Sequence, residues 1–156
     1  MKKRLLKIIL AVVIAFAVFN AAWFAWSHVK YGKLSDGMEA AEFNTVFDKR
    51  YFYTDADRYD FLVKYPAYLS FTGNMSVGMP AADGNPFTDA LIIWPTMTGQ
   101  YRFGALLYEE DGTGYSIYID AKGNALSKED EDVIARHRES IEVLFQKADE
   151  KWGVSD

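Results

Sequence analysis

Hydrophobic residues form one unbroken stretch near the start of the chain. Residues 8–26 (IILAVVIAFAVFNAAWFAW) contain no charged side chain. A helix of that length measures about 28 Å, close to the ~30 Å hydrocarbon core of a bilayer. Trp23 and Trp26 lie at its far end, where aromatic rings favour the headgroup region. The pattern therefore predicts a transmembrane helix over 8–26.

A cleaved signal peptide has the same basic start and apolar middle, so it is the competing interpretation. The one tidy small-x-small site is Ala15–Ala17, which leaves only Ile8–Ile14 as the hydrophobic region. Beyond that site the apolar stretch continues through bulky residues, among them Phe19 and Phe24. This arrangement favours a signal anchor that is retained.

Charges on the two sides of the apolar stretch predict its orientation. Residues 1–7 form a basic flank with four cationic side chains and no acid, whereas the polar stalk 27–35 and the residues after it mix both signs. The positive-inside rule then leaves the N-terminus in the cytoplasm. We expect a single-pass protein of the cell membrane, of bacterial type, whose residues 36–156 form an extracytoplasmic domain.

Two short helices are expected directly after the stalk. Asp36 and Glu39 have capping-box spacing, and the apolar residues that follow repeat at helical intervals, which predicts an amphipathic helix over 37–50. Thr54 and Asp57 offer a second cap, for one or two turns that end before Pro66.

The periodicity then changes to two, as in half-buried strands. Apolar residues or glycine occupy every second position of 69–79, and further strand-like segments cover 90–94, 101–108 and 115–120. The connections are short and rich in glycine and acidic residues. We therefore predict a four- to five-stranded antiparallel meander.

The end of the chain predicts one long helix over about 128–152. Ser127 and Asp130 have capping-box spacing, and Gly153 is a plausible stop. An apolar stripe runs from Val133 to Trp152 in steps of one, three and four residues. The fold class is α+β: a membrane helix, then a small sheet packed against a long C-terminal helix.

Composition and charge exclude several classes of function. Half of the residues are apolar and a quarter charged, which is typical of a folded chain. After the basic flank, 13 basic and 22 acidic groups remain, and a net charge of −9 offers no surface for nucleic acid. Without cysteine and with two histidines, we expect neither a metal site nor a cofactor.

Two groups of residues invite a chemical interpretation. His137 lies on the apolar stripe and would be a buried base, but no second histidine or G-x-S-x-G motif accompanies it, so we expect a structural, hydrogen-bonded side chain. Asp55, Asp57 and Asp60 form a D-x-D-x-x-D cluster that could ligate calcium. The cluster lacks the spacing of an EF-hand loop, and helix capping explains it as well.

Aromatic residues are dense between positions 51 and 71. Exposed tyrosines suit a sugar- or protein-binding face, which makes four of them candidate binding residues. A small core that uses tyrosine at its wet rim is the alternative that we favour. The four candidates are Tyr51, Tyr53, Tyr59 and Tyr65.

Small residues repeat at intervals of four within the predicted membrane helix. Ala17, Ala21 and Ala25 would let a second helix approach closely, and Asn20 could add a hydrogen bond inside the bilayer. These four residues are candidates for helix pairing.

The sequence as a whole favours a non-enzymatic role. We expect a membrane-anchored extracytoplasmic domain that binds another membrane protein, as an accessory subunit of a membrane or cell-envelope complex. The alternative is a module that binds cell-wall sugar or peptide through the aromatics of 51–71. An envelope hydrolase, ranked below both, would need two carboxylates that converge in one cleft.

Overall fold

The computed structural model describes residues 2–81 and 87–154. The chain divides into two compact units, one that ends at Leu34 and one that begins at Ser35. We call the second one the domain unit, and we describe each unit by itself.

The first unit is a single helix, α1 (Lys2–Leu34). It contains the predicted membrane segment 8–26 and extends through the stalk to Leu34. Its apolar stretch is long enough to cross a membrane. The sequence up to Tyr31 contains neither glycine nor proline, so nothing in it interrupts the helix. Gly37, with φ of +71°, lies just beyond its end.

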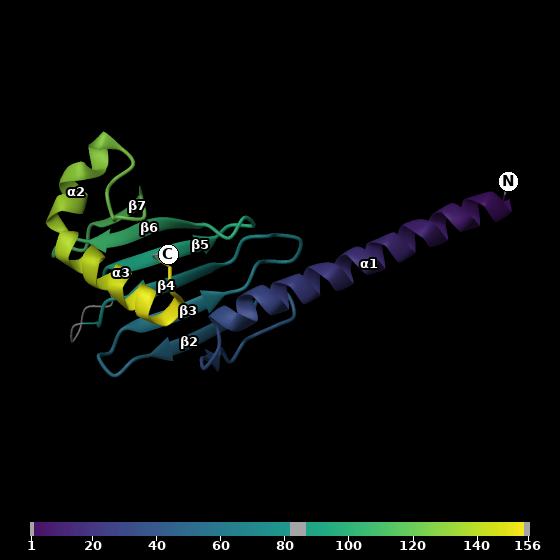
Figure 1. Cartoon of the computed structure of the whole chain (residues 1–156), viewed down its shortest axis with the longest axis horizontal. Coiled ribbons are helices and arrows are strands. Elements are labelled where there is room, and N and C mark those ends of the chain that lie inside the picture. The colour runs from purple at the N-terminus through teal and green to yellow at the C-terminus, as the bar shows by residue number, and fades with distance from the viewer. Residues whose placement is uncertain (1, 82–86, 155–156) are drawn as a thin grey trace. The chain divides into compact units, whose positions relative to one another are not determined.

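The domain unit is built on one antiparallel sheet of seven strands in sequential order (Figure 1). The predicted meander and the α+β class are confirmed, but the sheet has more strands than the four or five expected. The strands are β1 (Glu39–Ala40), β2 (Arg50–Thr54), β3 (Asp60–Lys64), β4 (Asn74–Gly78), β5 (Ala90–Pro95), β6 (Tyr101–Tyr108) and β7 (Gly114–Ile119).

The helix predicted over 37–50 is wrong: this segment forms β1, a loop and the start of β2. The Asn44 side chain accepts a hydrogen bond from the Arg50 amide and donates one to the Arg50 carbonyl, both at 2.8 Å. Thr45 Oγ1 accepts from the amides of Phe47 and Asp48. Such local side-chain bonds offer the backbone an alternative to the helix, and here they close the loop.

The helical turns predicted after Thr54 are also wrong, because residues 50–64 form the β2–β3 hairpin. Its turn is held by Asp55, whose Oδ1 accepts from the Tyr59 amide at 2.9 Å. An acid of the D-x-D-x-x-D cluster therefore stabilises a hairpin turn rather than a helix.

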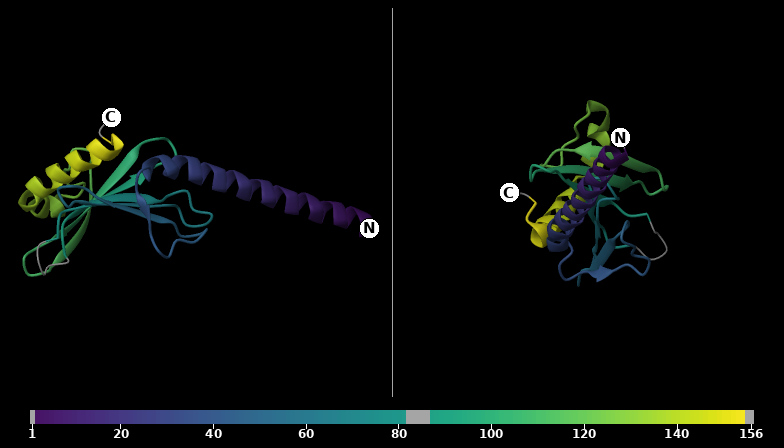
Figure 2. Two further views of the ribbon diagram at one scale, coloured as in Figure 1. Left: turned by 90° about the horizontal axis from the view of Figure 1, so that it is seen from below. Right: turned by 90° about the vertical axis from the view of Figure 1, so that its right-hand side faces the viewer.

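The core lies between one face of the sheet and the C-terminal helices. Cross-strand partners form two continuous rows of buried apolar side chains on this face, and α3 contributes Ile141, Leu144 and Ala148. Figure 2 shows α3 lying against the sheet from this side. From β3 to β7 the rows are Val63, Met75, Ile93, Phe103 and Ile119, and Phe61, Val77, Leu91, Ala105 and Ile117.

The predicted C-terminal helix is present but interrupted. A short 3-10 turn (Lys128–Asp130) leads into α2 (Glu131–Arg136) and then α3 (Arg138–Trp152). His137 separates α2 from α3, with φ of −100° and ψ of 14°. The stop at Gly153 is as expected, in a left-handed conformation. His137 at the break is hydrogen-bonded to Asp89, just before β5, a contact that periodicity alone does not show.

Candidate functional site

The face of the sheet opposite α3 carries a second row of side chains, and we call this surface the open face. Directly paired residues place Phe52, Leu62, Ser76, Ile92, Gly104 and Tyr118 side by side from β2 to β7. Within the described part of the domain unit, α2 and α3 both lie on the other side (Figures 1 and 2). Several of these side chains are therefore left accessible, among them Phe52 and Tyr118.

An aromatic pair occupies the β5–β7 part of the open face. The Trp94 and Tyr118 rings have centroids 5.8 Å apart, at an angle of 43°. A Cβ added to Gly104 would lie 2.9 Å from Cη2 and Cζ3 of Trp94. The absence of a side chain at Gly104 thus lets the indole lie flat against the neighbouring strand.

A cleft of about 360 Å³ opens beside this aromatic pair. Arg102 pairs directly with Trp94 across β5 and β6, so its side chain shares the face. No ion pair involves Arg102 among residues 2–81 and 87–154. The cleft therefore combines aromatic surfaces with a cation. Its lining residues are Thr72, Trp94, Thr96, Met97, Arg102 and Tyr118.

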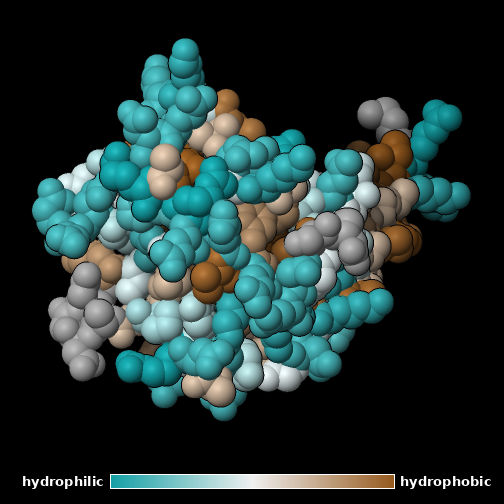
Figure 3. All heavy atoms as spheres, turned by 60° about the vertical axis from the view of Figure 1, so that its left-hand side comes forward, coloured by the Kyte–Doolittle hydropathy of each residue, from teal (hydrophilic) through white to brown (hydrophobic). Residues whose placement is uncertain are grey.

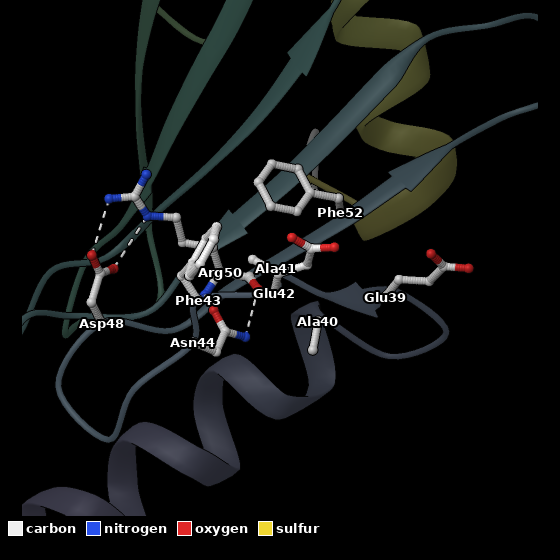
Figure 4. Close-up of a pocket in the computed structure, with 9 residues that line it drawn as sticks. All are labelled: Glu39, Ala40, Ala41, Glu42, Phe43, Asn44, Asp48, Arg50 and Phe52. Atoms are coloured by element: carbon white, nitrogen blue, oxygen red, sulfur yellow. Dashed lines mark hydrogen bonds and ion pairs between the residues drawn. The ribbon is translucent and has the colours of Figure 1, made fainter.

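A second hollow of about 590 Å³ borders the same face at β2 (Figure 4). Phe43 and Phe52 give it apolar walls, and Glu39 and Glu42 also line it. Arg50 is held there by Asp48 in a two-pronged ion pair, with N–O distances of 3.2 and 3.0 Å. This hollow can take an apolar group, with carboxylates available to a cation beside it.

His137 makes the hydrogen bond that the sequence analysis expected. Its Nδ1 lies 2.8 Å from Oδ2 of Asp89, and the other Asp89 oxygen accepts from the Tyr108 amide at 2.9 Å. Both side chains are about nine-tenths buried. His137 Nε2 lies 3.8 Å from a carboxylate oxygen of Glu109, which is itself bound by Arg136. The group ties the α2–α3 break to β5 and β6.

In the acidic cluster of Asp55, Asp57 and Asp60, two of the carboxylates bind the side chain of Lys147. Lys147 Nζ lies 2.8 Å from Asp55 and 2.6 Å from Asp57, whereas Asp60 accepts from the Thr54 hydroxyl. Burial raises the pKa of Asp55, but the Lys147 bond and the hydrogen bonds from the Tyr59 and Asp57 amides together outweigh it, so the pKa lies below its usual range. Hydrogen bonds to both acids raise the pKa of Lys147 well above its usual value. In the structure these acids serve as partners of Lys147 and of the hairpin turn, which gives no support to a calcium site.

The four tyrosine candidates are not gathered on one exposed surface. Tyr65 is buried and shares a hydrogen bond of 3.1 Å with Ser35, and Tyr51 lies against it with ring centroids 5.3 Å apart. Burial raises the pKa of Tyr65. Tyr53 contacts Phe61 on the helix-covered face. The ring centroid of Tyr59 lies 4.7 Å from Lys147 Nζ. The placement matches the wet rim of a core more closely than a sugar-binding platform.

The helix-pairing candidates lie on α1. Ala17, Ala21 and Ala25 share one side of the helix, because residues four apart are neighbours there. The Asn20 side-chain amide donates to the Phe16 carbonyl at 2.7 Å, within the same helix. Close approach by a second helix at the alanines stays a prediction.

Sequence reasoning missed the residues of the open face. The sequence pattern places Trp94, Arg102 and Tyr118 on strands but does not single them out as site residues. They alternate with the buried positions of those strands, so each points away from the core. The signal in the sequence is a large aromatic residue on the outward phase of each of the two strands that flank β6.

In comparisons with models of known families, with curated proteins and with solved structures, nothing matches this chain.

Proposed function

We propose that this protein is a membrane-anchored binding subunit, whose domain unit lies outside the cytoplasm and binds another membrane protein through the open face. On this proposal the protein is a non-enzymatic accessory component of a membrane or cell-envelope complex. The length and apolar character of α1 support the anchor, and the basic residues before it support the orientation.

The observation that carries the proposal is the cluster of Trp94, Arg102 and Tyr118 on the open face. Tryptophan, tyrosine and arginine are the residue types most enriched where binding energy concentrates in protein interfaces. Tyr118 is 66% exposed and lies at the β7 end of the row on the open face. A partner that covers this row would bury aromatic surface and place an acid beside Arg102.

The neighbouring features give less support to a hydrolase. The residues that line the Trp94 cleft include no carboxylate. Asp55 and Asp57 are both bound to Lys147. Catalysis by paired carboxylates requires two of them to face the same substrate bond, and neither cluster offers that arrangement.

Photo-crosslinking of the intact protein in its own membrane tests the proposal. A photoreactive phenylalanine derivative replaces Tyr118 in one variant and the exposed Glu142 of α3 in a control. We expect one discrete protein adduct at 118, absent at 142 and lost when Trp94→Ala is added. Equal labelling at both positions, or an adduct that survives Trp94→Ala, would contradict the proposal.

Cell-wall fragments are the control ligand for the alternative function. The intact protein in mild detergent is mixed with purified peptidoglycan and sedimented. Retention that depends on Trp94, together with the absence of a protein adduct at 118, would favour sugar or peptide binding over protein binding.

A further inference from the structure

The two ends of the sheet differ in polarity. In an antiparallel meander successive connections alternate between the ends, so loops 41–49, 65–73 and 96–100 share one end, which we call the apolar end. Turns 55–59 and 109–113 share the opposite end, which we call the acidic end. The strand β2 points to the acidic end at the left of Figure 1.

Large apolar side chains are exposed at the apolar end on all three loops. Phe43 is 88% exposed, and the others are between 47% and 69% exposed. Phe47 contacts Tyr68, with ring centroids 5.2 Å apart, so the first two loops lie side by side. The residues of this patch are Phe43, Val46, Phe47, Leu69 and Met97.

The loops hold these side chains outward. The 41–49 loop is closed by the hydrogen bonds of Asn44 and by the Asp48–Arg50 ion pair, so its conformation is already set. Leu69 has φ of +62°, a left-handed conformation that is sterically unfavourable for a bulky side chain. Leucine at an exposed, strained position is typical of a site that has a function.

The two ends also differ in charge: the acidic end is more negative than the apolar end. Loops 65–73 and 96–100 contain no charged residue, and in 41–49 the acids Glu42 and Asp48 are balanced by Lys49 and by Arg50 directly after the loop. By contrast, 109–113 (EEDGT) carries three acids, of which only Glu109 is ion-paired within the described part of the chain, with Arg136. In 55–59 the two acids are paired with Lys147. Figure 3, in which the left-hand side of Figure 1 is turned forward, shows a predominantly hydrophilic surface. An anionic bilayer surface would repel the acidic end and accept the apolar end.

The chain also limits how far the apolar end lies from the end of α1. Phe43 follows Leu34 by nine residues, which span about 30 Å at most even when fully extended. We propose that the apolar end is a second membrane contact, which inserts Phe43, Val46, Phe47, Leu69 and Met97 into the interfacial region of the bilayer that α1 enters. This inference rests on the proposed membrane insertion of α1.

Single-cysteine labelling tests the contact directly, because the chain has no cysteine of its own. Full-length Phe43→Cys and Met97→Cys variants carry an environment-sensitive nitrobenzoxadiazole dye. They are reconstituted in vesicles of phosphatidylcholine and phosphatidylglycerol, with or without doxyl-labelled lipid. The matched control is Phe87→Cys, a phenylalanine position that is 52% exposed in the loop between β4 and β5, at the acidic end.

We expect dyes at 43 and 97 to shift to the blue and to lose most of their emission when doxyl lipid is present, while the dye at 87 does neither. If the protein floats with the vesicles but all three dyes respond alike, the second membrane contact is refuted and the anchor stands. If the protein fails to float with the vesicles, the anchor is refuted and this inference falls with it.

Discussion

Replacement of Leu144 by alanine tests whether α3 covers the core side of the sheet. Leu144 lies on α3 and is fully buried, at 0% exposure. Truncation removes three carbon atoms, worth roughly 0.8 kcal/mol each as lost apolar burial. The cavity left behind adds to this cost, and we expect a total loss of about 3–4 kcal/mol of folding free energy.

The loss should be visible as a lower melting temperature of the intact protein. For a domain of about 120 residues, each kcal/mol lowers the melting temperature by roughly 4 °C, so Leu144→Ala should melt about 12–16 °C below the natural sequence. The measurement is thermal unfolding in mild detergent, followed by near-ultraviolet circular dichroism. This signal reports the packing of aromatic side chains rather than helix content, so the helicity of α1 does not mask it.

Glu142→Ala is the matched control, because Glu142 lies on the same helix and is exposed. We expect it to change the stability by less than about 0.5 kcal/mol. Leu144→Asp should be more severe and unfold the domain, since an unpaired buried carboxylate costs several kcal/mol out of a total stability of about 5–15 kcal/mol. If Leu144→Ala and Glu142→Ala melt together, Leu144 does not contribute to the core and the packing argument is refuted.

Three further outcomes are expected. Gly123→Ala should lower the free energy of unfolding by about 1–3 kcal/mol. The backbone at Gly123 is left-handed, and the new Cβ would lie 2.8 Å from Ile141 Cγ2. Equal urea midpoints for variant and natural protein would contradict this. The pKa of Asp55 is lowered in the folded state, so its contribution to stability is present at neutral pH and is lost as the pH falls through the folded pKa. Asp55→Asn should therefore lower the free energy of unfolding at neutral pH. It should also make that free energy decrease less as the pH is lowered, which urea midpoints at several pH values would measure. An unchanged pH dependence would show that the Asp55 carboxylate and its contact with Lys147 contribute nothing. Ala21→Leu should reduce co-purification of a membrane partner at matched abundance, because the larger side chain holds two helices apart, and full recovery would leave α1 as an anchor only.

The sequence alone determined the features that depend on local pattern. An apolar stretch of membrane length identifies α1 whatever surrounds it, because the requirement is a count of uncharged residues. Alternation likewise indicates strands, since every second side chain faces the core. It does so for 101–108, but of the alternating segment 69–79 only Asn74–Gly78 is a strand, and Leu69 and Phe71 lie exposed in the loop before it. Short connections between those strands then predict an antiparallel meander.

The same local reasoning failed where the outcome depended on distant partners. Phe43, Val46 and Phe47 have helical spacing, yet Asn44 bonds to Arg50 and β1 pairs with β2, so the segment is a loop that exposes them. At the break in the last helix, His137 is hydrogen-bonded to Asp89, which is 48 residues away in the sequence. Long-range bonds of this kind leave no periodic trace in the sequence.

The candidate binding face was decided by tertiary structure alone. Its members come from three strands and meet only because the register places Trp94 opposite Arg102 and Gly104 opposite Tyr118. A shift of one residue would send each of them to the core face. The tyrosines between 51 and 71 show the converse, because they are close in sequence but pairing turns Tyr51 and Tyr53 toward the covered side of the sheet. Composition determined which side chains were available for binding, and strand register determined which of them lie on an accessible surface.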